Sequence, residues 1–155
     1  MLGLVIAIDD PRADDVRDLL ARHLAFASDH SRPEDVHALD HDGLEDPDVT
    51  FFGARSGGEL LGIAALHELD ETHGELKSMH TAEEARGRGI GRAMVDHLVG
   101  VARERGYRRV SLETGSTEPF APALALYGSA GFTRCERFGE YPPDRENTFM
   151  TLELD

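Results

Sequence analysis

The chain almost completely lacks lysine. One of its 16 basic residues, Lys77, is a lysine and the other 15 are arginines. Asp and Glu number 30, which gives a formal net charge of −14. Nucleic acids and acidic membranes are polyanions, so this surplus argues against nonspecific binding to either. It favours a cationic or neutral substrate, or work in high salt, although a GC-rich genome would also enrich arginine over lysine.

Cysteine and long apolar runs are also scarce. A single cysteine, Cys135, cannot form a disulfide within the chain, which favours a reducing, cytoplasmic location. We expect it to be a buried small apolar residue of a strand rather than a nucleophile. The apolar residues 2–8 carry no basic residue and meet Asp9 and Asp10, so they predict a strand and not a signal peptide. No run approaches the roughly 20 residues that span a bilayer.

Hydrophobic patterns predict alternating strands and helices in a single domain over residues 1–155. Strands are predicted at 2–8, 49–54, 59–69, 75–81, 109–114, 133–138 and 147–154, and helices after Pro11, Pro33, Gly89 and Pro122. The order is β-α-α-β-β-β-α-β-α-β-β. Three consecutive meander strands followed by a β-α-β unit predict a mixed α/β sheet with helices on both faces.

The segment 86–92, Arg-Gly-Arg-Gly-Ile-Gly-Arg, carries the clearest chemical signal. Alternate glycines leave backbone N–H groups unshielded and allow a ligand to approach closely. The long helix begins here, so its free N–H groups and positive dipole end face the same place. Seven arginines and two acids between residues 86 and 109 predict further positive charge around this loop. We predict an anion site that suits a pyrophosphate; the alternative is a glycine-rich turn with a solvated arginine face.

Two common phosphate loops do not fit. The P-loop needs a Gly-Lys-Ser/Thr tripeptide, which the sequence lacks. A dinucleotide-binding fold needs Gly-x-Gly-x-x-Gly after its first strand, whereas Gly87, Gly89 and Gly91 lie in mid-chain at spacings of two. A metal site is not expected either, because the histidines are widely spaced and no cysteine cluster accompanies them.

Three motifs together resemble the GCN5-related N-acetyltransferase (GNAT) superfamily. Arg86-x-x-Gly89-x-Gly91 is similar to its acyl-CoA pyrophosphate loop, and Met79-His80-Thr81 resembles the end of its fourth strand. Residues 126–132, Leu-Tyr-Gly-Ser-Ala-Gly-Phe, resemble its Leu-Tyr-x-x-x-Gly-Phe element. Segments 31–40, 75–79 and 111–116 look like a subgroup of small bacterial acetyltransferases. The resemblance implies the GNAT fold, with strands four and five splayed apart, and acetyl-CoA as cofactor.

The resemblance also implies which residues hold the cofactor. The backbones of Met79 and Thr81 would bond the pantetheine amides, and the loop amides would bond the pyrophosphate. Many members carry an asparagine seven residues before the motif tyrosine, where this chain has Phe120. Ser116 or Thr117 would then make the cofactor contact that this asparagine makes in other members, or Phe120 would form part of the channel wall. The implied cofactor set is Met79, His80, Thr81, Arg86, Gly87, Arg88, Gly89, Ile90, Gly91, Arg92, Ser116, Phe120 and Tyr127.

Three residues are candidates for the chemistry. Tyr127 matches the tyrosine that protonates the leaving thiolate in many members, although it could instead pack on the sheet as an apolar ring. An alkylammonium has a pKa near 10, so a base must take a proton from the acceptor amine. Glu75 and Glu113, on the splayed strands, are the candidate bases, and each could instead pair with an arginine. We expect His80 to be a packed or hydrogen-bonded histidine rather than a base.

The resemblance implies direct acetyl transfer to the primary amine of a small molecule, without a covalent enzyme intermediate. The polar candidates for the acceptor pocket are His30, Glu34, His37 and Tyr141. Two alternatives stay open: a protein or peptide acetyltransferase, and a non-catalytic acyl-CoA-binding regulator. Homodimers are common in the superfamily, but the sequence does not show one here.

Overall fold

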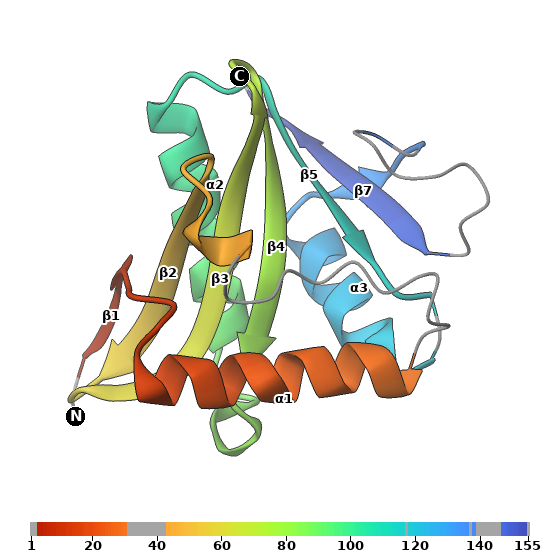
Figure 1. Ribbon diagram of the computed structural model, residues 1–155. Coiled ribbons are helices and arrows are strands. Elements are labelled where there is room, and N and C mark those ends of the chain that lie inside the picture. The colour runs from red at the N-terminus through yellow and green to blue at the C-terminus, as the bar shows by residue number, and fades with distance from the viewer. Residues whose placement is uncertain (1–2, 31–42, 117, 137, 139–146, 155) are drawn as a thin grey trace.

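The computed structural model describes residues 3–30, 43–116, 118–136, 138 and 147–154 (Figure 1). Seven strands form one sheet in the order β1-β2-β3-β4-β5-β7-β6. Their bounds are β1 (Leu4–Ile8), β2 (Val49–Ser56), β3 (Glu59–Asp70), β4 (His73–Thr81), β5 (Arg109–Thr114), β6 (Thr133–Arg134) and β7 (Thr148–Glu153). The β4–β5 pair is parallel and the other pairs are antiparallel. The predicted mixed α/β sheet is therefore confirmed.

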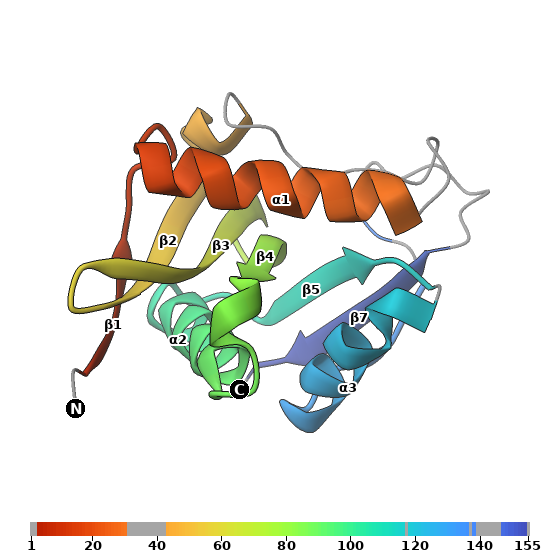
Figure 2. The same cartoon turned by 90° about the horizontal axis from the view of Figure 1, so that it is seen from below.

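Helices cover both faces of this sheet, as the pattern predicted. The helix α1 (Asp14–His30) lies on one face, and α2 (Ile90–Glu104) and α3 (Ala121–Ser129) lie on the other (Figure 2). Short 3-10 turns are η2 (Gly43–Glu45), η3 (Glu83–Ala85) and η4 (Glu118–Phe120). The helix predicted after Pro33 lies outside the described residues. No helix in the described ranges is long and apolar enough to cross a membrane.

The core follows from the apolar faces of the helices. Val16, Leu19 and Leu20 of α1 are buried on one side of the sheet. On the other side α2 buries residues at spacings of three and four: Ile90, Met94, Val95, Leu98, Val99 and Ala102. Burial of these side chains removes apolar surface from water and fixes α2, and therefore the loop before it, against the sheet.

The strand predicted over residues 133–138 is shorter than expected. The strand β6 covers Thr133–Arg134, and Cys135 follows it, with its N–H donating to the carbonyl of Phe149 at 2.9 Å. Cys135 is partly exposed, so the expectation of a buried strand residue is wrong. The reason is its place at the edge of the sheet, where β6 has β7 as its sole neighbouring strand in the described sheet.

The strands β4 and β5 separate at one end, as the resemblance implied. They pair from His73↔Arg109 to Leu76↔Leu112, and β4 then continues to Thr81 without β5. The register between β3 and β4 shifts by one residue in the same region, which identifies a β-bulge in β4. A bulge bends its strand and increases the local twist, which turns the end of β4 away from β5.

Candidate active site

A cavity of about 500 Å³ lies where β4 and β5 separate. It is lined by parts of α1, β4, the loop before α2, β5, η4 and α3. Thirteen of the predicted site residues line it: Glu75, Met79, His80, Thr81, Arg86, Gly87, Gly89, Ile90, Gly91, Arg92, Glu113, Phe120 and Tyr127. One cavity therefore brings together candidates from four separate segments of the chain.

Several predicted residues do not reach the cavity. Arg88 and Ser116 are absent from its lining, and the Ser116 hydroxyl lies 2.7 Å from that of Thr148 instead. The predicted contact of these two residues with the cofactor therefore finds no support in their placement. The acceptor candidates Glu34, His37 and Tyr141 lie outside the described residues, as do Thr117 and the side chain of His30.

The glycine-rich loop has the open backbone that an anion site needs. Gly87 and Gly89 both have φ of 80°, and a Cβ placed on either would meet nothing within 4 Å. Gly89 is also the N-cap residue of α2, so the free N–H groups of that helix end lie beside it. Gly91 has another role, because a Cβ there would lie 3.0 Å from Leu126 Cδ2. The first two glycines open the loop, and the third allows α3 to approach α2.

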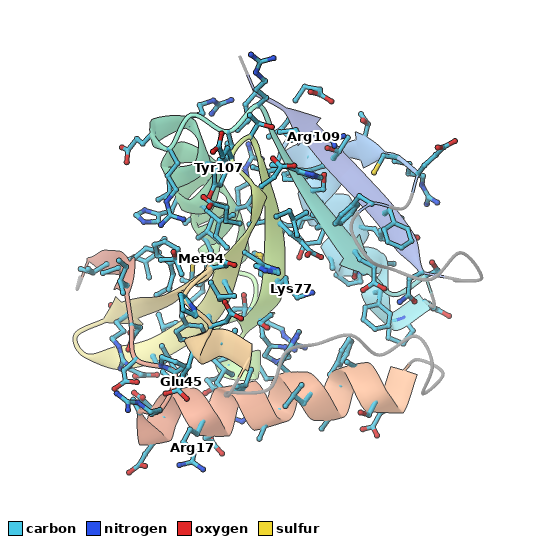
Figure 3. The ribbon with its side chains drawn as sticks, turned by 45° about the horizontal axis from the view of Figure 1, so that its top comes forward. Arg17, Glu45, Lys77, Met94, Tyr107 and Arg109 are labelled. Atoms are coloured by element: carbon cyan, nitrogen blue, oxygen red, sulfur yellow. The ribbon has the colours of Figure 1, made fainter. Side chains whose placement is uncertain are left out.

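The predicted concentration of arginines around this loop is wrong in part. The helix α2 has 15 residues, so about 22 Å of helix separates its two ends. Arg86, Arg88 and Arg92 lie at the loop end, whereas Arg103, Arg105, Arg108 and Arg109 lie at or beyond the other end. Figure 3 shows Arg109 at the end of the sheet farther from α1. The guanidinium of Arg92 is also engaged, by Asp96 Oδ1 at 3.1 Å and the Ser129 carbonyl at 3.2 Å.

Tyr127 has the environment of a proton donor. It lies in α3, is 7% exposed and lines the cavity. Burial raises the pKa of its phenol to about 12, because the charged phenolate is poorly solvated there. The phenol therefore keeps its proton at neutral pH and is available as a donor to a group on which negative charge develops.

The two carboxylates occupy different surroundings. Glu75 on β4 is 3% exposed, with Oε2 3.5 Å from Lys77 Nζ and Oε1 3.8 Å from His67 Nδ1. Glu113 on β5 is less buried and accepts a hydrogen bond from Asn147 Nδ2 at 2.6 Å. Glu75 thus lies between a cation and a titratable ring, whereas an amide orients Glu113.

Lys77 and Asn147 were missed as site residues by the sequence analysis. Lys77 is the single lysine of the chain, its side chain is 11% exposed, and it lies beside the gap between β4 and β5 (Figure 3). Asn147 also lines the cavity but comes from the far end of the sequence. The scarcity of lysine was the available signal for Lys77, and no local pattern marked Asn147.

An aromatic wall closes the cavity on the α1 side. His23 and Phe26 of α1 contact His80 of β4, and Phe26 also meets Phe120 with ring centroids 5.2 Å apart. Met79 and Thr81 instead lie near Gly91 of α2. His80 therefore faces away from its two neighbours and packs against α1. Within the described residues, no group of three or more His, Cys, Asp or Glu could hold a metal ion.

Comparison with known proteins decides the family. A sequence model of the Acetyltransferase (GNAT) family matches residues 13–132. The chain belongs to this family. It is 44% identical over 149 residues to Uncharacterized N-acetyltransferase YsnE of Bacillus subtilis. The aligned region covers 96% of this chain and 99% of that relative.

Solved GNAT structures share the fold of this acetyltransferase. A Bacillus subtilis acetyltransferase in complex with CoA superposes with a TM-score of 0.73 at 20% identity, covering 98% of this chain and 99% of that one. A GNAT acetyltransferase from Elizabethkingia anophelis with acetyl-CoA bound gives 0.72 at 18% identity, covering 97% and 98%. GNAT acetyltransferases use acetyl-CoA.

The residues of this GNAT acetyltransferase fit that cofactor. The open backbone at Gly87 and Gly89 suits a pyrophosphate, and the gap between β4 and β5 suits an extended arm. The Ser78 hydroxyl is buried beside the gap without a hydrogen-bond partner in the described part of the chain, so the site offers an unused polar group.

Proposed function

We propose that this protein transfers the acetyl group of acetyl-CoA to the primary amine of a small molecule by direct attack. The observation that carries the proposal is that a buried phenol and two carboxylates line one cavity at the separation of β4 and β5. A proton donor and a proton acceptor on either side of one gap are what amine acylation requires.

When bound, acetyl-CoA would supply an acyl thioester. Glu75 would take the proton that the neutral amine nitrogen loses as the new C–N bond forms, and Tyr127 would give its phenolic proton to the sulfur as the C–S bond breaks. Proton exchange through solvent would then move a proton from Glu75 back to Tyr127, so the net products are an acetamide and a thiol. The amides around Gly87 and Gly89 would hold the pyrophosphate and fix the arm in the gap.

Two features support a small acceptor. The Phe26–Phe120 contact joins α1 to η4 and narrows the cavity on that side, whereas a peptide needs an open groove. The cavity volume of about 500 Å³ is also in the range of small-molecule sites. Action on a protein or peptide amine and a non-catalytic acyl-CoA-binding role are the alternatives. A cytoplasmic location and a single domain remain predictions from the sequence.

A thiol-release screen tests the proposal. Purified protein and acetyl-CoA are incubated with amines, amino acids, polyamines, aminoglycosides and lysine-containing peptides. We expect at least one small amine to release CoA in proportion to enzyme and to yield the acetamide by mass spectrometry. Turnover with peptides alone would favour the protein acetyltransferase. Tight acetyl-CoA binding without turnover of any acceptor would favour the regulator.

A further inference from the structure

Lys77 is the one lysine in a chain that otherwise uses arginine for its basic residues. Its side chain is 11% exposed and lines the cavity. Glu75, on the same strand, is 3% exposed, and its Oε2 lies 3.5 Å from Lys77 Nζ. A buried ion pair contributes little net stability, because desolvation offsets the attraction between its charges. The explanation for this pair is therefore sought in the cavity that it faces.

Lys77 and Glu113 flank the point where β4 and β5 separate. The last pair between these strands is Leu76↔Leu112, and each of the two charged residues follows directly on its own strand. Paired residues of neighbouring strands share a face of the sheet, whereas successive residues of one strand alternate between faces. Lys77 and Glu113 therefore both lie on the face opposite to the two leucines. Glu75 precedes Leu76 and shares that face, so two carboxylates and one ammonium gather at the mouth of the gap.

The other cations of the cavity lie at its cofactor end. Arg86 precedes the glycine-rich loop, and Arg92 belongs to the first turn of α2. His23 and His80 add no charge at neutral pH, because burial lowers the pKa of each ring to about 4. Among the described residues that line the cavity, Lys77 is thus the one cation placed away from the loop, at the end left for an acceptor.

We propose that the acceptor is an α-amino acid whose carboxylate binds the ammonium of Lys77. The inference rests on the proposed function, in which the acceptor amine meets Glu75. Lys77 repels a polycationic acceptor and attracts an anionic group. Because Glu75 Oε2 and Lys77 Nζ are 3.5 Å apart, the two side chains suit an amine and a carboxylate carried on one carbon atom. An ammonium has three N–H donors, so it can bind Glu75 and a second carboxylate together.

A matched pair of acceptors tests this assignment. An amino acid amide keeps the amine and the side chain of the amino acid, but a neutral group of similar shape replaces the carboxylate. A panel of the L-amino acids of proteins and their α-amides is incubated with the wild type and acetyl-CoA, and CoA release is measured. We expect the best amino acid to exceed its own amide at least about 10-fold in kcat/KM, the effect of one hydrogen bond between charged groups. The amide has the less basic amine, so amine ionisation does not produce this preference.

Variants of Lys77 separate the carboxylate contact from effects on Glu75. Loss of the ammonium alters the surroundings of the proposed base, which changes the rate with the acid and the amide alike. The ratio of the two kcat/KM values isolates the contact and should fall to about 1 in Lys77→Met. Lys77→Arg keeps the charge and should keep a preference for the acid. Arg86→Met removes a cation from the loop end of the same cavity and should leave the ratio unchanged.

Three results would overturn the proposal: equal kcat/KM of acids and amides with the wild type, turnover of other amines but of no amino acid, and an unchanged ratio in Lys77→Met. Circular dichroism checks the fold, and Lys77→Gln replaces the methionine variant if that one does not fold. If the wild type acetylates no amine, the proposed function fails, and titration of the CoA-saturated protein with the same panel decides the role of Lys77. Binding of an amino acid but not of its amide, lost in the variant, supports the carboxylate site, and the absence of such binding overturns it.

Discussion

The Nδ1 atoms of His23 and His80 lie 3.3 Å apart and join α1 to β4 at the wall of the cavity. One ring must donate and the other accept, so the accepting ring must be neutral, and protonation of both rings breaks the contact. Burial lowers the pKa of both rings from 6.5 to about 4. The neighbouring His80 adds to the effect on His23, and the cations Arg86 and Arg22 add to the effect on His80.

This pair predicts a loss of stability in mild acid. Both histidines titrate near 6.5 when unfolded and near 4 when folded, so the unfolded state binds protons first as the pH falls. The neutral rings contribute fully to the free energy of unfolding above pH 6.5, and this contribution disappears progressively as the pH falls toward 4. At pH 5 the loss is on the order of 2 kcal/mol for buried His23 and smaller for the less buried His80.

Urea unfolding at pH 7 and pH 5 measures this loss. His23→Phe should lose less stability than wild type between the two values. His97→Gln is the control, because His97 packs on Phe52 instead. A pH dependence of His23→Phe equal to that of wild type would show that the pair is not the cause.

Removal of the Tyr127 hydroxyl should slow turnover without loss of the cofactor. Tyr127→Phe removes the proton donor, and we expect kcat to fall about 100-fold with acetyl-CoA affinity unchanged. Tyr107→Phe is the matched control, since its hydroxyl donates to Glu68 Oε1 at 2.6 Å outside the cavity lining. Steady-state kinetics and titration distinguish the two variants. Wild-type kcat in Tyr127→Phe would exclude it as the acid.

The surroundings of the two carboxylates predict unequal effects on the rate. Glu75 is almost fully buried beside Lys77, whereas Glu113 accepts a hydrogen bond from Asn147. We expect Glu75→Gln to lower kcat about 100-fold and Glu113→Gln less than about 10-fold. Circular dichroism checks that both variants fold. The reverse order of effects would assign the base to Glu113.

The open glycine loop predicts where a side chain blocks binding. Gly89→Glu introduces bulk and negative charge where the pyrophosphate should lie, so acetyl-CoA binding should become undetectable by titration. Gly58→Glu is matched in its backbone, with φ of 85° and open space, but lies in the β2–β3 turn outside the cavity lining. It should have the same strain and keep wild-type affinity. Equal affinities of the two variants would show that the loop does not bind the cofactor.

The net charge of −14 predicts a response to salt. If the acidic surface reflects adaptation to high salt, unfolding free energy should rise steeply with KCl up to molar concentrations, because screening removes repulsion between like charges. Denaturation at several KCl concentrations measures the slope. If the protein is fully stable without added KCl, genome composition is instead the favoured cause of the arginine bias.

Local sequence patterns determined much of this protein. Strand alternation, the apolar face of α2 and the glycine-rich segment depend on residues close in the chain, so their periodicity and backbone requirements are readable directly. The resemblance placed Tyr127, Glu75 and Glu113 around one gap, and the cavity contains all three. The predicted strand over residues 133–138 was too long, because the local pattern does not show which strand forms the edge of a sheet.

Only the tertiary structure decided the remaining features of the site. The His23–His80 contact joins residues 57 apart, and Asn147 reaches Glu113 across 34 residues. The order of strands and the packing of α1 set such contacts, and no local pattern records them. The arginines around α2 show the converse. Those in 86–92 and those in 103–109 are near one another in sequence, but the length of α2 separates them in space. The positive φ of Ser78 lies in the bulged part of β4, whose register against β3 is set by the pairing of the sheet.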